Sequence, residues 1–173
     1  MKSHARVVVI GGGVVGVSTL YHLAKKGWSD VVLVERKELT SGSTWHAAGL
    51  LPLFNMSYSV GQIHKYSVKF YQELQEETGM DVGFRNVSNI RLASNQERMD
   101  EFRQYAGVAS TIGVQVDFLT PEQVLDYWPM ANIEGLVGAI RHPQDGYIQP
   151  ADLTQALARG ARDRGAEIYR NTA

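Results

Sequence analysis

The residues with the clearest chemical potential are three glycines near the N-terminus. Gly11, Gly13 and Gly16 give the spacing G-x-G-x-x-G within the run GGGVVG. In such a turn the first glycine permits a tight bend, the second lets the backbone approach a pyrophosphate, and the third allows close packing of a helix on a strand. The helix that follows offers unpaired N–H groups to anionic oxygens. The turn therefore predicts a phosphate-binding site.

An acidic residue lies where a dinucleotide site needs one. Glu35 follows Gly16 by about twenty residues, at the end of an apolar run over 31–34. Its carboxylate can accept hydrogen bonds from an adenosine ribose and would repel the additional phosphate of NADP. A glycine-rich turn in an ordinary α/β protein would explain the glycines but not this complete pattern. We therefore predict dinucleotide binding, with FAD and NAD both open.

A polar loop over 36–49 comes directly after this acid. Residues 41–44 supply hydroxyl donors and permissive turns that could wrap an extended cofactor, which favours FAD slightly over NAD. On residue type alone, His46 is expected to bond a nearby backbone carbonyl, and Trp45 beside it is expected to pack rather than react.

The elements that must position these residues form one βαβ unit. The apolar runs over 6–10 and 31–34 predict parallel strands, and the β-branched first run is typical of a central strand covered on both faces. Between them, apolar residues recur at helical spacing over 14–26, and Gly27 suits the left-handed residue that ends a helix. Residues 6–35 match the usual length of such a unit.

The remaining chain departs from simple βαβ repetition. Its periodicity and turn residues predict helices over 59–78, 96–112, 121–128 and 151–164, strands over 82–87, 89–93, 114–119, 136–141 and from 167, and a turn at Asp145-Gly146. We expect the last helix and strand to return to the first sheet as a second crossover. The fold class is therefore α/β, with residues 1–79 and 145–173 in the cofactor-binding domain and residues 80–144 in an inserted second domain.

Composition excludes several classes of protein. The chain has 173 residues, 44% hydrophobic and 20% charged, as in a globular domain. A net charge of -1, with dispersed Lys and Arg, argues against a nucleic-acid partner. No apolar run is long enough to span a bilayer, the histidines show no metal-ligand spacing, and without cysteine there is no disulfide or thiolate. Arg91 is expected to form a strand salt bridge rather than to bind a substrate carboxylate.

The run over 39–50, LTSGSTWHAAGL, resembles the segment of the dimethylglycine and sarcosine dehydrogenase family in which a histidine carries covalently attached FAD. These are FAD-dependent amine oxidoreductases of the D-amino acid oxidase superfamily. The resemblance continues through YQELQEETG at 71–79, NIRLA at 89–93 and LTQALARGARDRG at 153–165, and so covers almost the whole chain. It implies a Rossmann-like FAD-binding domain of the glutathione-reductase type with an inserted α+β segment of the substrate domain.

The resemblance also implies a set of site residues. His46 would carry the flavin, and an imidazole nitrogen on the flavin 8α-carbon should raise the reduction potential and prevent loss of the cofactor. Trp45 would only contact the flavin. The implied cofactor-binding set is Gly11, Gly13, Val14, Val15, Gly16, Glu35, Arg36, Gly42, Ser43, Thr44, Trp45, His46, Ala47, Ala48, Gly49 and Leu50.

The reaction that the resemblance implies is oxidation of a small N-methyl amine, such as dimethylglycine or sarcosine, by hydride transfer to flavin. Electrons would leave through an electron-transfer flavoprotein or to oxygen, and tetrahydrofolate could take up the one-carbon unit in a region beyond Ala173. Relatives continue well past this point. We therefore expect residues 1–173 to be an N-terminal part, inactive alone, with no identifiable catalytic residue, weak FAD binding and a tendency to aggregate.

Two alternatives remain open. A non-redox regulatory homologue, like the regulatory subunit of pyruvate dehydrogenase phosphatase, would share the glycine turn, although the pair Trp45-His46 argues against that branch. An NAD-dependent dehydrogenase is the other. Residues 1–6 leave no room for a transit peptide, which favours a bacterial cytoplasmic protein over a mitochondrial matrix protein.

Overall fold

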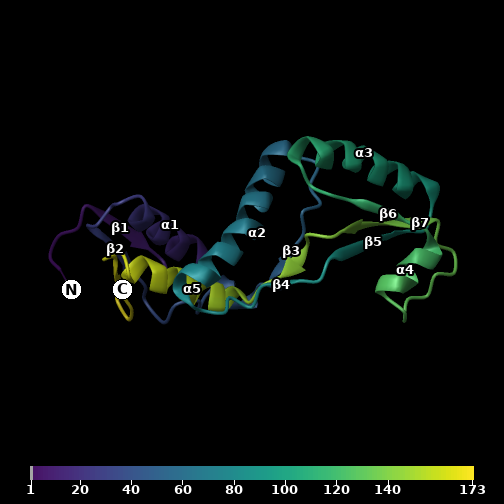
Figure 1. The fold of residues 1–173 in the computed structure, drawn as a ribbon. Helices are drawn as coiled ribbons and strands as arrows, with labels where there is room; N and C mark the ends of the chain where they lie inside the picture. The colour runs from purple at the N-terminus through teal and green to yellow at the C-terminus, as the bar shows by residue number, and fades with distance from the viewer. Residues whose placement is uncertain (1) are drawn as a thin grey trace. The chain divides into compact units, whose positions relative to one another are not determined.

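The βαβ unit is present in the computed structural model, which describes residues 2–173. Strand β1 (Val7–Ile10) pairs in parallel with β2 (Val31–Val34), and helix α1 (Val14–Lys25) connects them (Figure 1). Gly27 has a φ of +85° after the end of α1, the left-handed conformation that glycine adopts without strain. These elements bring the glycine turn to the C-terminal end of β1.

The C-terminal crossover returns to the same sheet, as the sequence predicted. Helix α5 (Pro150–Arg162) packs on α1 and leads into β9 (Glu167–Tyr169), which pairs in parallel with β2. The strand order is β1-β2-β9. The α/β fold class is therefore confirmed.

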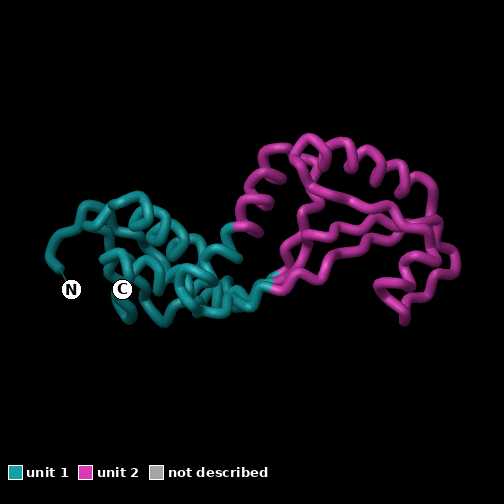
Figure 2. The backbone as a smooth tube through the Cα atoms, in the orientation of Figure 1, with its two compact units in different colours: residues 1–49, 70–84, 148–173 teal, residues 50–69, 85–147 magenta. Residues whose placement is uncertain are grey.

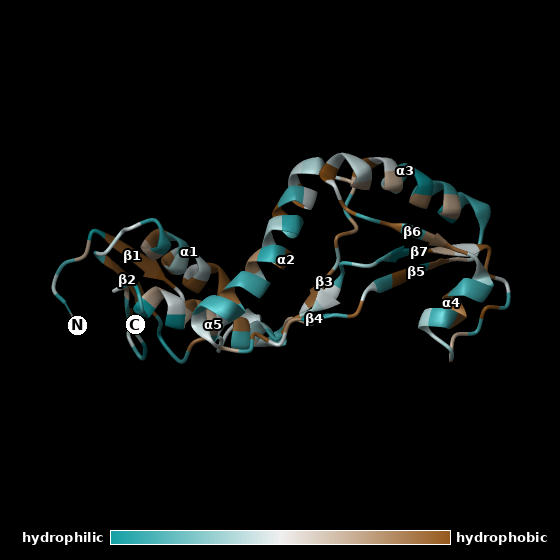
Figure 3. Cartoon of the chain, viewed as in Figure 1, coloured by the Kyte–Doolittle hydropathy of each residue, from teal (hydrophilic) through white to brown (hydrophobic). Residues whose placement is uncertain are grey.

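The position of β1 differs from the expectation. Among residues 2–173, β1 is the edge strand of its sheet, and Val8 and Ile10 are 51% and 85% exposed. Figure 3 shows β1 and β2 as strongly hydrophobic strands. The β-branched run correctly indicates a strand, but it carries no information about which neighbours cover that strand.

A second group of elements forms an antiparallel sheet with two helices. Strands β5 (Asn89–Ala93), β7 (Gly138–His142) and β6 (Asp117–Leu119) pair in the order β5-β7-β6. Helices α3 (Gln96–Ile112) and α4 (Pro121–Tyr127) contact these strands. The buried side chains Phe102, Tyr105 and Ile140 belong to one hydrophobic cluster of this group.

The short elements differ most from the prediction, and η1, β3 and β8 were not predicted. A 3₁₀ helix, η1, spans Ser43–His46, and a small antiparallel sheet joins β3 (Leu50–Leu51), β8 (Gly146–Tyr147) and β4 (Arg85–Asn86). The predicted strand over 82–87 is thus reduced to β4, and the one over 114–119 to β6. The turn predicted at Asp145-Gly146 lies at residues 143–144 instead, and Gly146 already belongs to β8.

The chain divides into two compact units (Figure 2). Unit 1 contains residues 1–49, 70–84 and 148–173, and unit 2 contains residues 50–69 and 85–147. Helix α2 (Tyr58–Thr78) contributes residues to both. The sequence predicted residues 1–79 and 145–173 in one domain, whereas residues 50–69 belong to unit 2 here. None of the helices in residues 2–173 combines the length and the apolar character that a bilayer crossing requires.

Candidate cofactor-binding site

The glycine turn has the geometry that its residue types require. Gly11 has a φ of +108°, which residues with a side chain rarely adopt. A Cβ atom at Gly16 would lie 2.0 Å from the carbonyl oxygen of Gly11. Gly16 therefore allows α1 to approach the end of β1 as closely as it does.

The first turn of α1 offers backbone donors to a ligand. The N–H groups of Gly13 and Val15 make no hydrogen bond within residues 2–173. The N–H of Val14 donates to Oγ1 of Thr44 at 3.0 Å, so one donor at this helix start is already used by the loop after β2. A Cβ atom at Gly13 would lie 3.0 Å from the same Oγ1 atom. The loop and the turn are thus packed together before any ligand binds.

Glu35 is fixed by the backbone on both carboxylate oxygens. Oε2 accepts from the N–H of Gly12 at 2.7 Å, and Oε1 accepts from the N–H of Lys37 at 2.8 Å. These two hydrogen bonds, that from Gly12 first, lower the pKa of Glu35 below its usual value. The carboxylate is therefore ionised at neutral pH and is held in one orientation.

A groove of about 490 Å³ lies between the turn and the loop. Its volume lies within the range of small-molecule sites. It is lined by Gly11, Gly12, Gly13, Val14, Val15, Glu35, Arg36, Lys37, Ser41, Gly42, Ser43, Thr44 and Ala47. The unpaired N–H groups and the glycines fit the phosphates of FAD. The acid at the end of β2 fits its ribose.

Three lining residues were outside the predicted set. Gly12 and Lys37 contribute the N–H groups that hold Glu35, and Ser41 borders the same groove. A Cβ atom at Gly12 would lie 2.7 Å from Leu39 and 2.9 Å from Glu35, which is a packing requirement that the spacing of the glycines alone does not reveal.

The other members of the predicted set do not line the groove. Gly49 has a φ of +71°, and a Cβ atom there would lie 2.0 Å from the carbonyl oxygen of Ile148, so this glycine is needed for a close backbone approach. Leu50 belongs to β3 and is 68% exposed. The members outside the groove are Gly16, Trp45, His46, Ala48, Gly49 and Leu50.

His46 lies at the end of η1 with an exposed side chain. Its ring packs against that of Trp45, with centroids 4.2 Å apart, and it makes no hydrogen bond within residues 2–173. The alternative in which His46 bonds a backbone carbonyl is therefore not what the structure shows. The imidazole is thus exposed and has no hydrogen-bond partner among residues 2–173.

Arg91 does not form the expected salt bridge. Its guanidinium lies over the ring of Phe54, 4.1 Å from the ring centroid, and it has no ion pair with any residue in 2–173. On the neighbouring strands it is Arg141 that pairs with Asp117, at 2.8 Å. The sequence could indicate a cation on β5 but not that the ion pair of this sheet belongs to Arg141 on β7.

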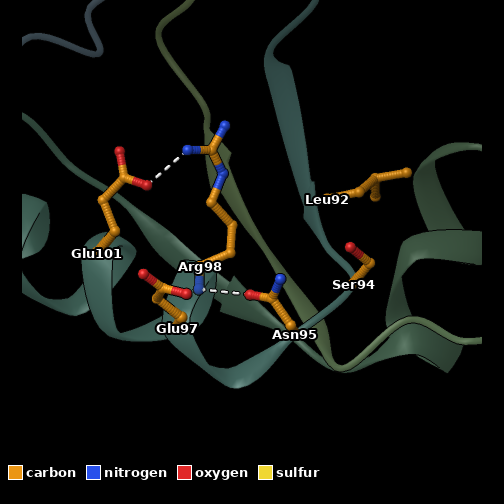
Figure 4. Close-up of a pocket in the computed structure, with 6 residues that line it drawn as sticks. All are labelled: Leu92, Ser94, Asn95, Glu97, Arg98 and Glu101. Carbon is orange, nitrogen blue, oxygen red and sulfur yellow. Dashed lines mark hydrogen bonds and ion pairs between the residues drawn. The ribbon is translucent and has the colours of Figure 1, made fainter.

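A second hollow, of about 460 Å³, lies at the start of α3 in unit 2 (Figure 4). Three of its polar residues already bond to one another: Asn95 caps the helix by accepting from the N–H of Arg98 at 2.8 Å, and Arg98 pairs with Glu101 at 2.5 Å. We therefore assign no ligand to it. Across residues 2–173 no group of three or more His, Asp and Glu side chains is arranged to hold a metal ion.

The parallel βαβ unit, the glycine turn and the acid at the end of β2 together define a dinucleotide-binding domain. The chain belongs to the DAO family, described as FAD dependent oxidoreductase, whose model matches residues 6–173.

Named relatives agree with this assignment. Mitochondrial dimethylglycine dehydrogenase of Rattus norvegicus is 46% identical over 164 residues, covering 95% of this chain and 19% of the relative. The mitochondrial pyruvate dehydrogenase phosphatase regulatory subunit of Mus musculus is 36% identical over 172 residues, covering 99% of this chain and 20% of the relative. The chain therefore spans about a fifth of the length of these relatives.

A solved structure shows the same fold. The crystal structure of L-proline dehydrogenase from P. horikoshii superposes with a TM-score of 0.92 and 27% sequence identity, covering 99% of this chain and 45% of that chain. The order of helices and strands in residues 2–173 is thus that of a known oxidoreductase.

Proposed function

We propose that this chain forms the FAD-binding part of an enzyme that oxidises an N-methyl amine of the dimethylglycine or sarcosine kind, with FAD attached covalently through His46. The observation that carries the proposal is the groove between the glycine turn, Glu35 and the loop over 41–47, in a chain of an FAD-dependent family. Because the chain spans about a fifth of its named relatives, the activity of the whole protein is part of the proposal.

The first turn of α1 would hold the pyrophosphate. The N–H groups of Gly13 and Val15 are unpaired within residues 2–173, and the positive end of the helix dipole favours negative charge there. Gly11 and Gly13 carry no side chain that would keep a phosphate away from the backbone. The binding of this part of FAD thus depends on the backbone more than on any side chain.

Glu35 would orient the adenosine end. Each carboxylate oxygen holds one backbone N–H and keeps a further lone pair for a ribose hydroxyl. The lowered pKa keeps the carboxylate charged, so a 2′-phosphate would be repelled. Glu35 would therefore both bind the ribose and exclude NADP.

FAD, when bound, supplies the acceptor for the hydride that leaves the substrate. His46 would bond the flavin through a ring nitrogen, act as a tether and raise the reduction potential, and Trp45 would contact the same region. No residue of this chain is assigned to proton transfer or to substrate binding.

The relatives support the proposed substrate class. Dimethylglycine and L-proline are small amines that carry a carboxylate, and these names belong to the relatives described above. Three further points stay predictions. They are an electron-transfer flavoprotein as electron acceptor, tetrahydrofolate as acceptor of the one-carbon unit, and a location in the bacterial cytoplasm or in the mitochondrial matrix. Cell fractionation and acceptor assays with the purified protein test them.

A regulatory role is the second candidate, because the mouse regulatory subunit is 36% identical over nearly the whole chain. Such a protein would share the dinucleotide-binding fold and carry out no amine oxidation. An NAD-dependent dehydrogenase is the third, and it would lack flavin absorbance after purification.

The deciding experiment compares wild type, His46→Ala and His4→Ala. His4→Ala is the matched control, because His4 is another exposed histidine and lies outside the groove. The mass of the denatured protein and the flavin fluorescence of the unfolded band are measured for each. We expect the added mass of FAD in wild type and His4→Ala, and its loss in His46→Ala.

Substrate is then added without oxygen. Bleaching of the flavin bands by dimethylglycine or sarcosine supports the amine-oxidising function. Bound flavin that no amine bleaches favours the regulatory candidate, and native protein without flavin favours the NAD candidate. Flavin that binds reversibly in all three proteins contradicts the covalent link at His46 and no other part of the proposal.

A further inference from the structure

Helix η1, which carries His46, is held against the glycine turn by a hydrogen bond of its own. The N–H of Val14 donates to Oγ1 of Thr44 at 3.0 Å, and the side chain of Thr44 is buried. The carbonyl oxygen of Thr44 accepts from the N–H of Ala47 at 3.2 Å and so closes the turn that contains His46. Thr44 thus bonds to the start of α1 with its side chain and spans His46 with its backbone.

The same loop is bonded to the glycine turn a second time, on the other side of Gly13. The N–H of Thr40 donates to the carbonyl oxygen of Gly12 at 3.0 Å. Thr40 has a φ of +70°, a conformation that β-branched residues rarely adopt. Such strain persists only where the surrounding structure enforces it. The loop is therefore docked on the turn at two places, and Thr44 is the one nearer to His46 in the chain.

The place of η1 is set within one compact unit. A Cβ atom at Gly13 would lie 3.0 Å from Oγ1 of Thr44, so the absence of a side chain at Gly13 allows this close approach. Helix α5 also contacts η1, and η1, α1 and α5 all belong to unit 1. The glycine turn and α5 together therefore determine where η1 lies.

The side chain of His46 depends on η1 for its position. It is exposed, and its ring lies against that of Trp45, the preceding residue of η1, with centroids 4.2 Å apart. It makes no hydrogen bond within residues 2–173. A shift of η1 away from the glycine turn would therefore move the imidazole with it.

The geometry points to Thr44 as the positioning residue for His46. Its bond to Val14 fixes the distance between the helix start that would hold the pyrophosphate and the imidazole that would bond the flavin. FAD held at the turn would then meet His46 at a fixed place, which accelerates the reaction between them. This inference rests on the proposed function, because His46 is the residue that would carry the flavin.

The attachment itself involves His46 and not Thr44. A ring nitrogen of His46 forms a bond to the 8α-carbon of the flavin, and this nitrogen and this carbon each give up a hydrogen. Both hydrogens pass to the flavin ring, which is thereby reduced, and dissolved oxygen re-oxidises it. The effect of Thr44 is on the position of His46 alone.

The test measures the first-order rate of attachment at saturating FAD, in the whole protein purified without flavin. The mass of the denatured protein, sampled over time, gives this rate. Thr44→Val removes the oxygen that accepts from Val14 and should slow attachment roughly tenfold, because a small displacement of a reacting group has effects of this size or larger. Thr44→Ser keeps the hydroxyl and should restore most of the rate that Thr44→Val loses.

Thr19→Val is the matched control. Thr19 is exposed on α1, its hydroxyl donates to the carbonyl oxygen of Val15 at 2.9 Å, and it lies outside the groove. The same change of side chain there should leave the rate within about twofold of wild type. Equal slowing in Thr19→Val and Thr44→Val would overturn the inference.

The dissociation constant of FAD separates positioning from binding, and it is measured in a His46→Ala background. Thr44→Val should weaken reversible binding about threefold at most, because the N–H groups of Gly13 and Val15 stay available to the pyrophosphate. Weaker binding combined with a wild-type rate at saturating FAD would show that Thr44 only contacts the cofactor. That result would overturn the inference.

Thr44→Ala is a second variant if Thr44→Val does not fold, which thermal unfolding detects. It removes the same acceptor with a smaller side chain and should also slow attachment roughly tenfold. A wild-type rate in either folded variant overturns the inference while the proposed function stands. Wild-type protein that holds flavin only reversibly overturns the covalent link and this inference with it. Wild-type protein that holds no flavin overturns the proposed function as well.

Discussion

The N–H of Gly12, in the glycine turn, donates to Oε2 of Glu35 at 2.7 Å, and so joins the turn to the acid at the end of β2. In a His46→Ala background, where FAD binding is reversible, Glu35→Ala should weaken binding roughly tenfold, through loss of hydrogen bonds on the order of 1–2 kcal/mol. Titration followed by flavin fluorescence measures this. Glu38→Ala removes an exposed acid that pairs with Arg170, and it should bind FAD as the parent does.

Gly16→Ala should damage both the fold and the cofactor site. The new Cβ would lie 2.0 Å from the backbone oxygen of Gly11, so α1 must move away from β1, at a cost on the order of 1–3 kcal/mol. Thermal unfolding and FAD titration should both detect the change. Gly107→Ala is the matched control, because nothing lies within 4 Å of its Cβ and Gly107 lies outside the groove. Equal losses in the two variants would contradict the packing argument.

Asp145 and His142 should give opposite dependences of stability on pH. Burial raises the pKa of Asp145 from 3.8 to about 6, so its stabilising contribution is complete below pH 4 and is lost as the pH rises through 6. Burial lowers the pKa of His142 from 6.5 to about 4, so its contribution is complete above pH 6.5 and is lost as the pH falls through 4. Each of the two groups should change the free energy of unfolding by on the order of 3 kcal/mol across its interval.

Single substitutions should separate these two dependences of the free energy of unfolding on pH. Asp145→Asn leaves His142 unopposed, so the free energy of unfolding should fall as the pH drops from 6.5 to 4. His142→Phe leaves Asp145 unopposed, so the free energy of unfolding should rise as the pH drops from 6.5 to 4. Denaturant unfolding at a series of pH values measures both, and slopes of the same sign in the two variants would be inconsistent with the burial of these groups.

Gly107→Ala should stabilise the protein. Gly107 is an exposed residue inside α3, and nothing lies within 4 Å of a Cβ built there. Alanine should raise the free energy of unfolding by about 0.5–1 kcal/mol, because glycine loses more backbone entropy in a helix. A lower Tm in this variant would show that α3 has a contact at Gly107 that the structure lacks.

Local patterns were enough to predict the parallel part of the fold. The strands β1 and β2, helix α1 and the return of β9 follow from short-range periodicity and from the handedness rule for crossovers. These patterns do not say which residues cover a strand, and within residues 2–173 Val8 and Ile10 of β1 are exposed.

The site was harder to predict in the loop than in the turn. The glycine spacing and Glu35 have a local signature, whereas the bond from Val14 to Thr44 joins residues thirty positions apart. Asp145 shows most clearly what a local pattern cannot predict. Followed by glycine, it has the signature of a turn, but it is a buried acceptor for Leu53, which lies 92 positions away in the chain.

The contact between Trp45 and His46 has an optical consequence. Trp45 is 61% exposed, and its indole lies against the ring that would bond the flavin. If His46 carried the flavin, the indole beside it would transfer its excitation to the isoalloxazine instead of emitting light. Attachment at His46 would then quench the fluorescence of Trp45, so this fluorescence would report how much of the protein carries the cofactor.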